Sequence, residues 1–323
     1  MPTLRARDRV GIDPQSIEFA DGRSLLRGQY ENGTIRVQHL SLRGMFVTAD
    51  KNWTSPDLPA EQSPGGSAMC SDADGARELY ADLLVRNLVD AIHGKPWEGP
   101  WRPGNKFDRG PHPPGRLGPN FAHTMVGVDR LENLRQLTQR ALDDGIPGDF
   151  IETGVWRGGC CILMRGILAA NEVRDRKVYV ADSFAGVPAP RPDIYPADRE
   201  LRLDLCTELV VSLETVKENF SRYGLLDDQV VFVEGLFSDT LPALDAGSFA
   251  LVRLDGDLYE STLVALQNLY PKLSPGGFLI VDDYGVIEAC RQAVHDYRAR
   301  HDVDAPINWI DRSGVWWRRQ ATT

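Results

Sequence analysis

Residues 148–159 read Gly-Asp-Phe-Ile-Glu-Thr-Gly-Val-Trp-Arg-Gly-Gly, a short apolar run that leads into a glycine-rich turn. A helical pattern begins near Cys160, so the segment has the order strand, turn, helix. Glycine lets a backbone approach a ligand, and the first N–H groups of a helix are free to bind one. Gly154, Gly158 and Gly159 have the spacing G-x-x-x-G-G, which argues against the G-x-G-x-x-G dinucleotide fingerprint. The segment predicts a β–α unit that either binds a different ligand or is a plain β–α turn.

Further apolar runs follow, and helical patterns separate them; the runs are residues 178–180, 230–233, 249–254 and 278–281. Continuous apolar strands that alternate with helices are typical of a parallel sheet buried on both faces. At the C-terminal end, the runs Ile307–Ile310 and Val315–Trp317 are separated only by a turn, so they must form an antiparallel hairpin. The pattern predicts an α/β fold with five parallel strands and a terminal hairpin, which together make a seven-stranded sheet.

Residues 1–74 differ from the rest of the chain in their sequence pattern, which is rich in turn residues. Asp21-Gly22 and Asn32-Gly33 are dipeptides that favour tight hairpins, and short β-type runs flank them. Residues 56–71 are rich in Pro, Gly and Ser, as linkers are. We expect a small β-rich N-terminal extension that ends in a linker.

Residues 75–125 form a second region, and residues 126–323 hold the regular α/β pattern. The second region begins with a helix expected over Gly75–His93, whose apolar residues at helical spacing are Leu79, Leu83, Leu84, Leu88 and Ile92. Residues 95–119 are too rich in proline for regular structure. A long loop of this kind is either functional or a linker, and we expect it to belong to a lid region.

Composition and charge limit the classes of partner. The chain has 323 residues and a formal net charge of -10, which opposes a nucleic-acid backbone. It has no apolar run of the roughly 18 residues that a membrane span needs, and no signal peptide pattern, so we expect a cytoplasmic protein without a membrane partner. The 5 cysteines have no regular spacing, which argues against a disulfide framework or a zinc site.

Acidic residues stand at the ends of the first two strands of the α/β region. Glu152 suits a positively charged amine, such as that of S-adenosylmethionine, more than a phosphate. Asp182 can accept hydrogen bonds from both hydroxyls of a ribose, although it could instead be a helix N-cap. Open α/β sheets bind ligands at the carboxyl ends of adjacent strands, so the two acids predict one cofactor crevice.

A second group of acids follows the fourth and fifth strands. Asp255 ends one strand, and Asp282 and Asp283 end the next. Adjacent parallel strands lie about 5 Å apart, so the three carboxylates are expected to converge. Converging carboxylates repel unless a proton or a cation compensates, and oxygen ligands alone select Mg²⁺, or else Mn²⁺ or Ca²⁺. The alternative is a set of solvated loop ends.

The stretch from Ala122 to Arg318 resembles the macrocin O-methyltransferase family, most clearly at residues 148–159, 180–184, 219–228, 254–257 and 274–284. The resemblance covers roughly residues 75–319. It implies a class I S-adenosylmethionine-dependent methyltransferase fold, Rossmann-like, with strand order 3-2-1-4-5-7-6. It also implies Mg²⁺-dependent methylation of a sugar hydroxyl on a glycosylated natural product, as in antibiotic biosynthesis.

The same resemblance implies roles for individual residues. It assigns cofactor binding to Met125, Glu152, Thr153, Gly154, Gly158, Asp182, Ser183, Gly235 and Phe237. It assigns Mg²⁺ to Asp255, Asp282 and Asp283, with Asp255 also the general base. The chain departs from the family at Leu236, where the family has Trp, and at residues 116–120, where family members that act on macrolide sugars carry an aromatic lid residue.

Other interpretations remain open at this point. A catechol-type phenolic O-methyltransferase would use a similar carboxylate and Mg²⁺ site, and a binding or assembly protein could share the fold. His123 could be a base but is expected to orient the lid loop, and Cys160-Cys161 is expected to be structural. We expect a small-molecule glycosylated substrate and a homo-oligomer, because the edge of a small N-terminal sheet could pair with another chain.

Overall fold

The computed structural model describes residues 16–20, 24–31, 34–41, 72–93 and 122–320. The chain divides into two compact units, Met1–Ala68 and Met69–Thr323. The first helix of the larger unit begins at Asp72, close to the start expected for the second region.

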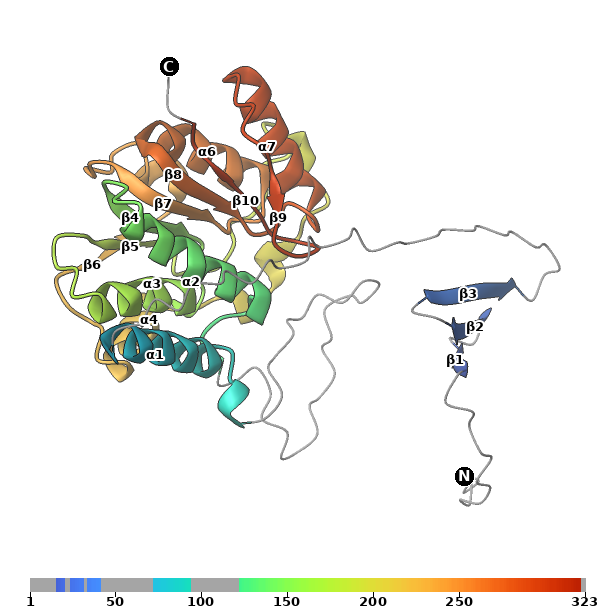
Figure 1. Ribbon diagram of the computed structural model, residues 1–323. Helices are drawn as coiled ribbons and strands as arrows, with labels where there is room; N and C mark the ends of the chain where they lie inside the picture. Colours follow the sequence, from blue (N-terminus) through green and yellow to red (C-terminus); the bar gives the residue numbers. More distant parts are fainter. Residues whose placement is uncertain (1–15, 21–23, 32–33, 42–71, 94–121, 321–323) are drawn as a thin grey trace, which may run out of the picture. The chain divides into compact units, whose positions relative to one another are not determined.

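The smaller unit holds a three-stranded antiparallel sheet (Figure 1). Its strands are β1 (Ser16–Ala20), β2 (Ser24–Glu31) and β3 (Thr34–Ser41), paired in that order. The strands stand where the sequence has β-type runs, at 16–19, 24–26 and 34–37, and each strand continues beyond its run. The turn dipeptides Asp21-Gly22 and Asn32-Gly33 lie outside the described residues.

The larger unit is built on a seven-stranded sheet of order β6-β5-β4-β7-β8-β10-β9. The strands are β4 (Asp149–Thr153), β5 (Val178–Asp182), β6 (Val230–Glu234), β7 (Phe249–Leu254), β8 (Leu273–Val281), β9 (Asn308–Trp309) and β10 (Val315–Arg318). The first five pair in parallel, and β10 pairs antiparallel with both β8 and β9. Counted from β4, this is the order 3-2-1-4-5-7-6, so the predicted sheet and its terminal hairpin are confirmed.

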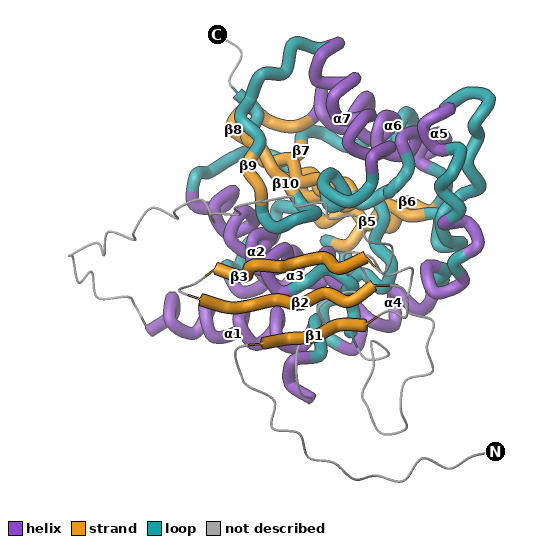
Figure 2. The backbone as a smooth tube through the Cα atoms, turned by 90° about the vertical axis from the view of Figure 1, so that its right-hand side faces the viewer, coloured by secondary structure: helices purple, strands orange, loops and turns teal. Residues whose placement is uncertain are grey.

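Helices cover both faces of this sheet (Figures 1 and 2). One layer contains α1 (Asp72–Leu88), α2 (Val128–Asp143), α3 (Gly159–Ala170) and α4 (Leu213–Arg222). The other contains α5 (Phe237–Thr240), α6 (Tyr259–Leu269) and α7 (Glu288–Arg300). Short 3-10 turns lie at Ala91–His93, Pro196–Asp198, Leu203–Leu205, Thr207–Leu209 and Tyr270–Lys272.

Neighbouring residues of each central strand enter opposite cores. Phe150 packs in the core with α2 and α3, whereas Ile151 packs in the core with α6 and α7. Phe278 and Leu279 of β8 divide in the same way. Because successive side chains of a strand point to opposite faces, a sheet covered on both sides favours apolar residues at successive positions.

The first helix differs from its prediction. It ends at Leu88 rather than near His93, and only part of the predicted apolar face is buried. Leu84 and Leu88 are buried, but Leu79 and Leu83 are 74% and 58% exposed. The helix packs on α2 and α3 through a face that is rotated toward Ala81 and Val85, so the leucine spacing identified only part of the buried side.

Two predicted segments, the linker at 56–71 and the proline-rich stretch at 95–119, lie outside the described residues. Among the helices that the structure describes, none is long and apolar enough to cross a membrane.

Candidate active site

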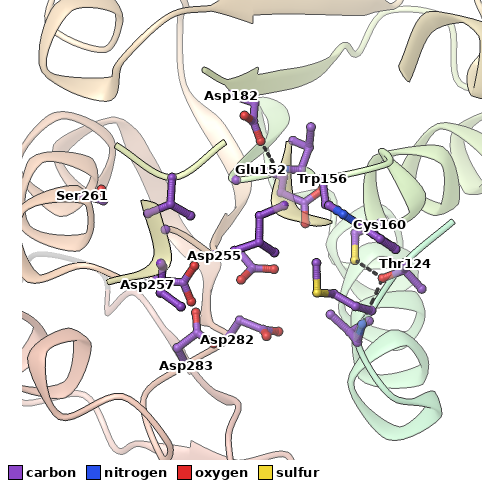
Figure 3. Close-up of a pocket in the computed structure, with 18 of the residues that line it drawn as sticks. Thr124, Glu152, Trp156, Cys160, Asp182, Asp255, Asp257, Ser261, Asp282 and Asp283 are labelled. Carbon is purple, nitrogen blue, oxygen red and sulfur yellow. Dashed lines mark hydrogen bonds between the residues drawn. The ribbon is translucent and has the colours of Figure 1, made fainter. Parts of the chain in front are cut away.

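A cavity of about 510 Å³ lies at the carboxyl ends of the central strands (Figure 3). Ten of the predicted site residues line it: Met125, Glu152, Gly154, Asp182, Ser183, Gly235, Phe237, Asp255, Asp282 and Asp283. Cavities of this size hold small-molecule ligands. Thus residues that were predicted at five separate strand ends and in one loop line the same cavity.

Thr153 and Gly158, the remaining two predicted cofactor residues, do not line the cavity. The Thr153 hydroxyl is buried, without a hydrogen-bond partner among the described residues. Gly158 is the N-cap of α3 with φ 85°, and a Cβ there would lie 2.9 Å from Val216 Cγ1. In the structure these two positions contribute to packing and to the start of the helix.

Gly154 brings the first strand end against the fourth. Its φ is 85°, and a Cβ at this position would lie 1.8 Å from the backbone oxygen of Asp255. Only glycine tolerates both this conformation and this contact. The glycine therefore allows the turn after β4 to pack directly against the backbone of Asp255, where the acidic cluster begins.

Glu152 is 1% exposed, and both of its carboxylate oxygens have protein donors. Arg253 Nη1 donates to Oε1 at 2.5 Å, and Cys161 Sγ donates to Oε2 at 2.9 Å. Burial raises the pKa of Glu152 to about 7, although Arg253 opposes the shift. Its carboxyl group is thus a fixed and largely covered part of the cavity wall.

Asp182 organises the turn on which a cofactor would rest. Its Oδ2 accepts a hydrogen bond from Val155 N at 2.7 Å, and its Oδ1 accepts one from Phe184 N at 2.8 Å. Burial raises the pKa of Asp182, while these backbone donors lower it. No helix begins at this point, so the helix N-cap alternative is wrong; the bond to Phe184 closes a local turn instead.

The second acidic group converges as its strand positions predict. Asp255, Asp282 and Asp283 each offer a carboxylate oxygen, and these oxygens lie within 4.8 Å of one another. Asp283 Oδ2 is buried without a hydrogen-bond partner in the described part of the chain. Burial, followed by repulsion from neighbouring aspartates, raises the pKa of Asp283 well above its ordinary value. An all-oxygen donor set with an unpartnered buried oxygen fits a hard divalent cation such as Mg²⁺.

Asp257 adds a fourth carboxyl to this end of the cavity. Burial, together with the charges of Asp255 and Asp282, raises the pKa of Asp257 to about 8. No role was predicted for Asp257 from the sequence, although the Asp-Gly-Asp spacing at 255–257 is a signal for an acidic site.

Two arginines contact Asp282, one at each carboxylate oxygen, and neither was predicted from the sequence to have a role. Arg253 Nη2 donates to Oδ1, and Arg130 Nη1 donates to Oδ2. Arg130 Nε also lies 3.1 Å from Asp311 Oδ2, in the turn between β9 and β10. The available signal was a charged residue inside an otherwise apolar strand, Phe-Ala-Leu-Val-Arg-Leu at 249–254.

The connection between β5 and α4 forms a further wall. It contributes Val187, Pro188, Leu203 and Leu209 to the cavity. Trp156 Nε1 donates to Glu208 O at 2.8 Å.

Asp198 anchors the same connection to the N-terminus of α6. This buried residue accepts hydrogen bonds from Tyr259 N at 2.6 Å and Glu260 N at 3.1 Å. The connection is thereby tied to the turn that carries Asp255 and Asp257.

His123 and Cys161 lie outside the cavity lining, whereas Cys160 is part of it. His123 does not line the cavity, and its Nδ1 is 2.8 Å from the Tyr223 hydroxyl. Burial raises the pKa of both Cys160 and Cys161, which keeps the thiols protonated. These surroundings favour the structural interpretation of all three residues.

Comparison with known proteins identifies the family of this chain. The family described as Macrocin-O-methyltransferase (TylF) matches residues 87–319. The 8-demethyl-8-(2,3-dimethoxy-alpha-L-rhamnosyl)-tetracenomycin-C 4'-O-methyltransferase of Streptomyces olivaceus is 51% identical over 251 residues, which are 77% of this chain and 96% of the relative. The mycinamicin III 3''-O-methyltransferase of Micromonospora griseorubida is 50% identical over 254 residues, 76% of this chain and 97% of the relative.

The solved structure of the O-methyltransferase NovP matches with a TM-score of 0.68 at 47% identity, over 76% of this chain and 100% of NovP. The family match, the fold and the relatives agree with one another. The chain is therefore a member of the macrocin O-methyltransferase family, an S-adenosylmethionine-dependent O-methyltransferase.

Proposed function

We propose that this enzyme uses Mg²⁺ to methylate a sugar hydroxyl of a glycosylated natural product. The observation that carries the proposal is the set of three carboxylate oxygens within 4.8 Å, at the β7–β8 end of the cavity. The relatives named above are O-methyltransferases of a rhamnosyl tetracenomycin and of mycinamicin III, which supports a glycosylated acceptor.

The cofactor would lie over the ends of β4 and β5. There Gly154, Asp182 and Ser183 line the cavity, and the Asp182 carboxylate is held in place by backbone donors. Its oxygens retain lone pairs that can accept from ribose hydroxyls. Glu152 would face the amino group, with its carboxylate fixed by Arg253 and Cys161.

The acceptor would lie between the methyl group and the β7–β8 acids. Asp255 is the general base of this proposal, because its side chain is 23% exposed and lines the cavity. The acceptor oxygen forms a bond to the methyl carbon as the bond from that carbon to sulfur breaks, and the hydroxyl proton passes to Asp255. The products are the methyl ether and S-adenosylhomocysteine.

A divalent cation held by Asp255, Asp282 and Asp283 would supply Lewis acidity that lowers the pKa of the acceptor hydroxyl. The rest of the rate acceleration would come from a rigid strand end that positions the base and the acceptor, because aligned reactants avoid the entropy cost of encounter.

A phenolic acceptor of the catechol type is the second candidate, since vicinal hydroxyls on a ring would suit the same carboxylates. The wall formed by Val187, Pro188, Leu203 and Leu209 would receive either an aglycone or an aromatic ring. A non-catalytic role is not retained, because the relatives are enzymes.

The direct test is methyl transfer from labelled S-adenosylmethionine to a panel of rhamnosylated, other glycosylated and catechol acceptors, with Mg²⁺ and with excess EDTA. We expect labelled product from a glycosylated acceptor only when Mg²⁺ is present. Product from catechols alone would favour the second candidate, and full activity in EDTA would refute the metal requirement.

We also propose that the enzyme is a homo-oligomer. The described residues of the N-terminal unit form a sheet of three strands; three short strands alone are marginal in water, and the edge of such a sheet can pair with another chain. Light scattering of the full chain and of a variant that begins at Ser71 tests this. Fewer subunits per particle for the shortened chain support assembly through the extension, and a full chain that is monomeric contradicts it.

A further inference from the structure

One arginine lies behind the acids of the active site. Arg253 stands on β7, the strand between β4 and β8, and is 2% exposed. It does not line the cavity, although the three carboxyl groups that it contacts do.

The contacts of Arg253 join three strands. Its Nη1 donates to Glu152 Oε1 on β4 at 2.5 Å and to Asp255 Oδ2 after β7 at 2.7 Å. Its Nη2 donates to Asp282 Oδ1 after β8. One guanidinium group therefore contacts the carboxyl group on the cofactor side, the proposed base and a proposed metal ligand.

Burial of an arginine is unfavourable unless nearby anions balance its charge and acceptors bind its N–H groups. Removal of an ion from water costs several kcal/mol, and partners with good geometry repay this cost. The planar guanidinium can satisfy two or three acceptors in fixed directions, whereas the ammonium group of lysine is a compact point charge. The side chain is thus suited to fixing angles between acids, not merely to neutralising them.

We propose that Arg253 is a positioning residue that sets the relative orientation of Glu152, Asp255 and Asp282, and so couples cofactor placement to the base and to the metal ligands. The inference rests on the proposed function, because it takes Asp255 as the base and Asp282 as a ligand. It adds one requirement to the proposed function. The enzyme needs the guanidinium group of Arg253 for full activity even when Glu152, Asp255 and Asp282 are all present.

The test compares Arg253→Lys with Arg165→Lys. Arg165 is the matched control, because it is a buried arginine that donates to Asp227 through Nε at 3.1 Å and also through Nη2, and it does not line the cavity. The measured quantities are the melting temperature, the dissociation constants of Mn²⁺ and S-adenosylhomocysteine by calorimetry, and kcat and KM for the acceptor that the panel identifies.

For Arg253→Lys we expect kcat to fall about 100-fold, as for other misalignments near 1 Å, with acceptor KM within about threefold of wild type. The Mn²⁺ dissociation constant should rise about 10-fold, the usual effect of losing a partner of a metal ligand. Arg165→Lys should lower the melting temperature without changing kcat or Mn²⁺ affinity. The proposal is overturned if Arg253→Lys retains kcat and Mn²⁺ affinity within about twofold, or if both variants lose them equally.

If Arg253→Lys does not fold, the double variant Arg253→Lys with Glu152→Gln removes one acid and provides the second measurement. Failure of both to fold while Arg165→Lys folds would make Arg253 a folding residue and refute the positioning role. If wild type binds no Mn²⁺ and keeps its activity in EDTA, the metal part of the proposed function fails, and the change in kcat still decides the role of Arg253.

Discussion

The two ends of the cavity hold their acids in different ways. At the β4–β5 end, the Asp182 carboxylate accepts hydrogen bonds from two backbone N–H groups, and Glu152 has one donor for each oxygen. At the β7–β8 end, Asp283 has a buried oxygen without a partner in the described residues, and burial raises the pKa of Asp257 to about 8. In the first end each of these carboxylate oxygens has a donor, whereas the second holds four carboxyl groups, Asp255, Asp257, Asp282 and Asp283, beside two arginines.

Because the two ends differ in this way, we expect substitutions of their acids to have different effects. Loss of a carboxylate at the β4–β5 end should loosen a preformed binding surface. Loss of one at the β7–β8 end should remove a base or a cation ligand and leave the cofactor surface intact. The following predictions test that division, beginning with the largest effect.

Asp255→Asn should lower kcat by about 10²- to 10⁴-fold, the usual contribution of a general base. The affinity for S-adenosylhomocysteine should stay within about threefold of wild type, because the substitution keeps the shape of the side chain. Single-turnover rates and calorimetry measure the two quantities, with Asp228→Asn on an exposed loop as the control. Loss of cofactor affinity with an unchanged rate would reverse the assignment of the two ends.

Asp283→Asn should weaken Mg²⁺ binding about 10- to 100-fold, since the amide offers one neutral oxygen in place of a carboxylate. Asp282→Asn should have a similar effect, and cofactor affinity should hardly change for either variant. Titration with Mn²⁺ followed by magnetic resonance checks this directly. Wild-type activity that persists in excess EDTA would show that this end of the cavity does not need a cation.

Asp182→Ala should raise the dissociation constant of S-adenosylhomocysteine about 10-fold, because it removes the proposed ribose contact and the acceptor for Val155 N. The rate at saturating cofactor should fall much less. Calorimetry with Asp175→Ala as an exposed control measures the change. An unchanged dissociation constant would place the cofactor elsewhere in the cavity.

The metal-free protein should become less stable as the pH rises. Burial raises the pKa of Glu152 from 4.5 to about 7, and burial with neighbouring charges raises that of Asp257 from 3.8 to about 8. A raised carboxyl pKa favours the folded state below the unfolded pKa, and this stability is lost as the pH passes through the folded pKa. We expect the melting temperature to fall between about pH 5 and about pH 8.

Differential scanning fluorimetry in EDTA and in Mg²⁺ measures this trend. Mg²⁺ should raise the melting temperature more at the upper end of that range, because ligand binding stabilises the folded state most where the ligands are ionised. Asp257→Asn should show a smaller decline than wild type. A melting temperature that rises with pH in EDTA would contradict the buried-acid interpretation of the β7–β8 end.

Local pattern was sufficient to predict the sheet and the two acidic groups. Apolar residues at successive positions of a strand such as 278–281 indicate burial on both faces, and a turn as short as Asp311 to Gly314 leaves only a hairpin. Acids that follow adjacent parallel strands must meet at one edge, which is why Asp255, Asp282 and Asp283 could be brought together before any coordinates.

Other features depend on contacts between residues that are far apart in the sequence. Arg253 contacts Glu152 across 101 positions, and Arg130 contacts Asp282 across 152. Leu79 and Leu83 have the spacing of a buried helix face, yet the packing of α1 on α3 leaves them exposed. Sequence periodicity indicates which residues share a helix or strand face or lie at a strand end, because local backbone geometry determines the direction of each side chain. It does not record which side chain fills the space between three strands, because that depends on the packing of the whole chain.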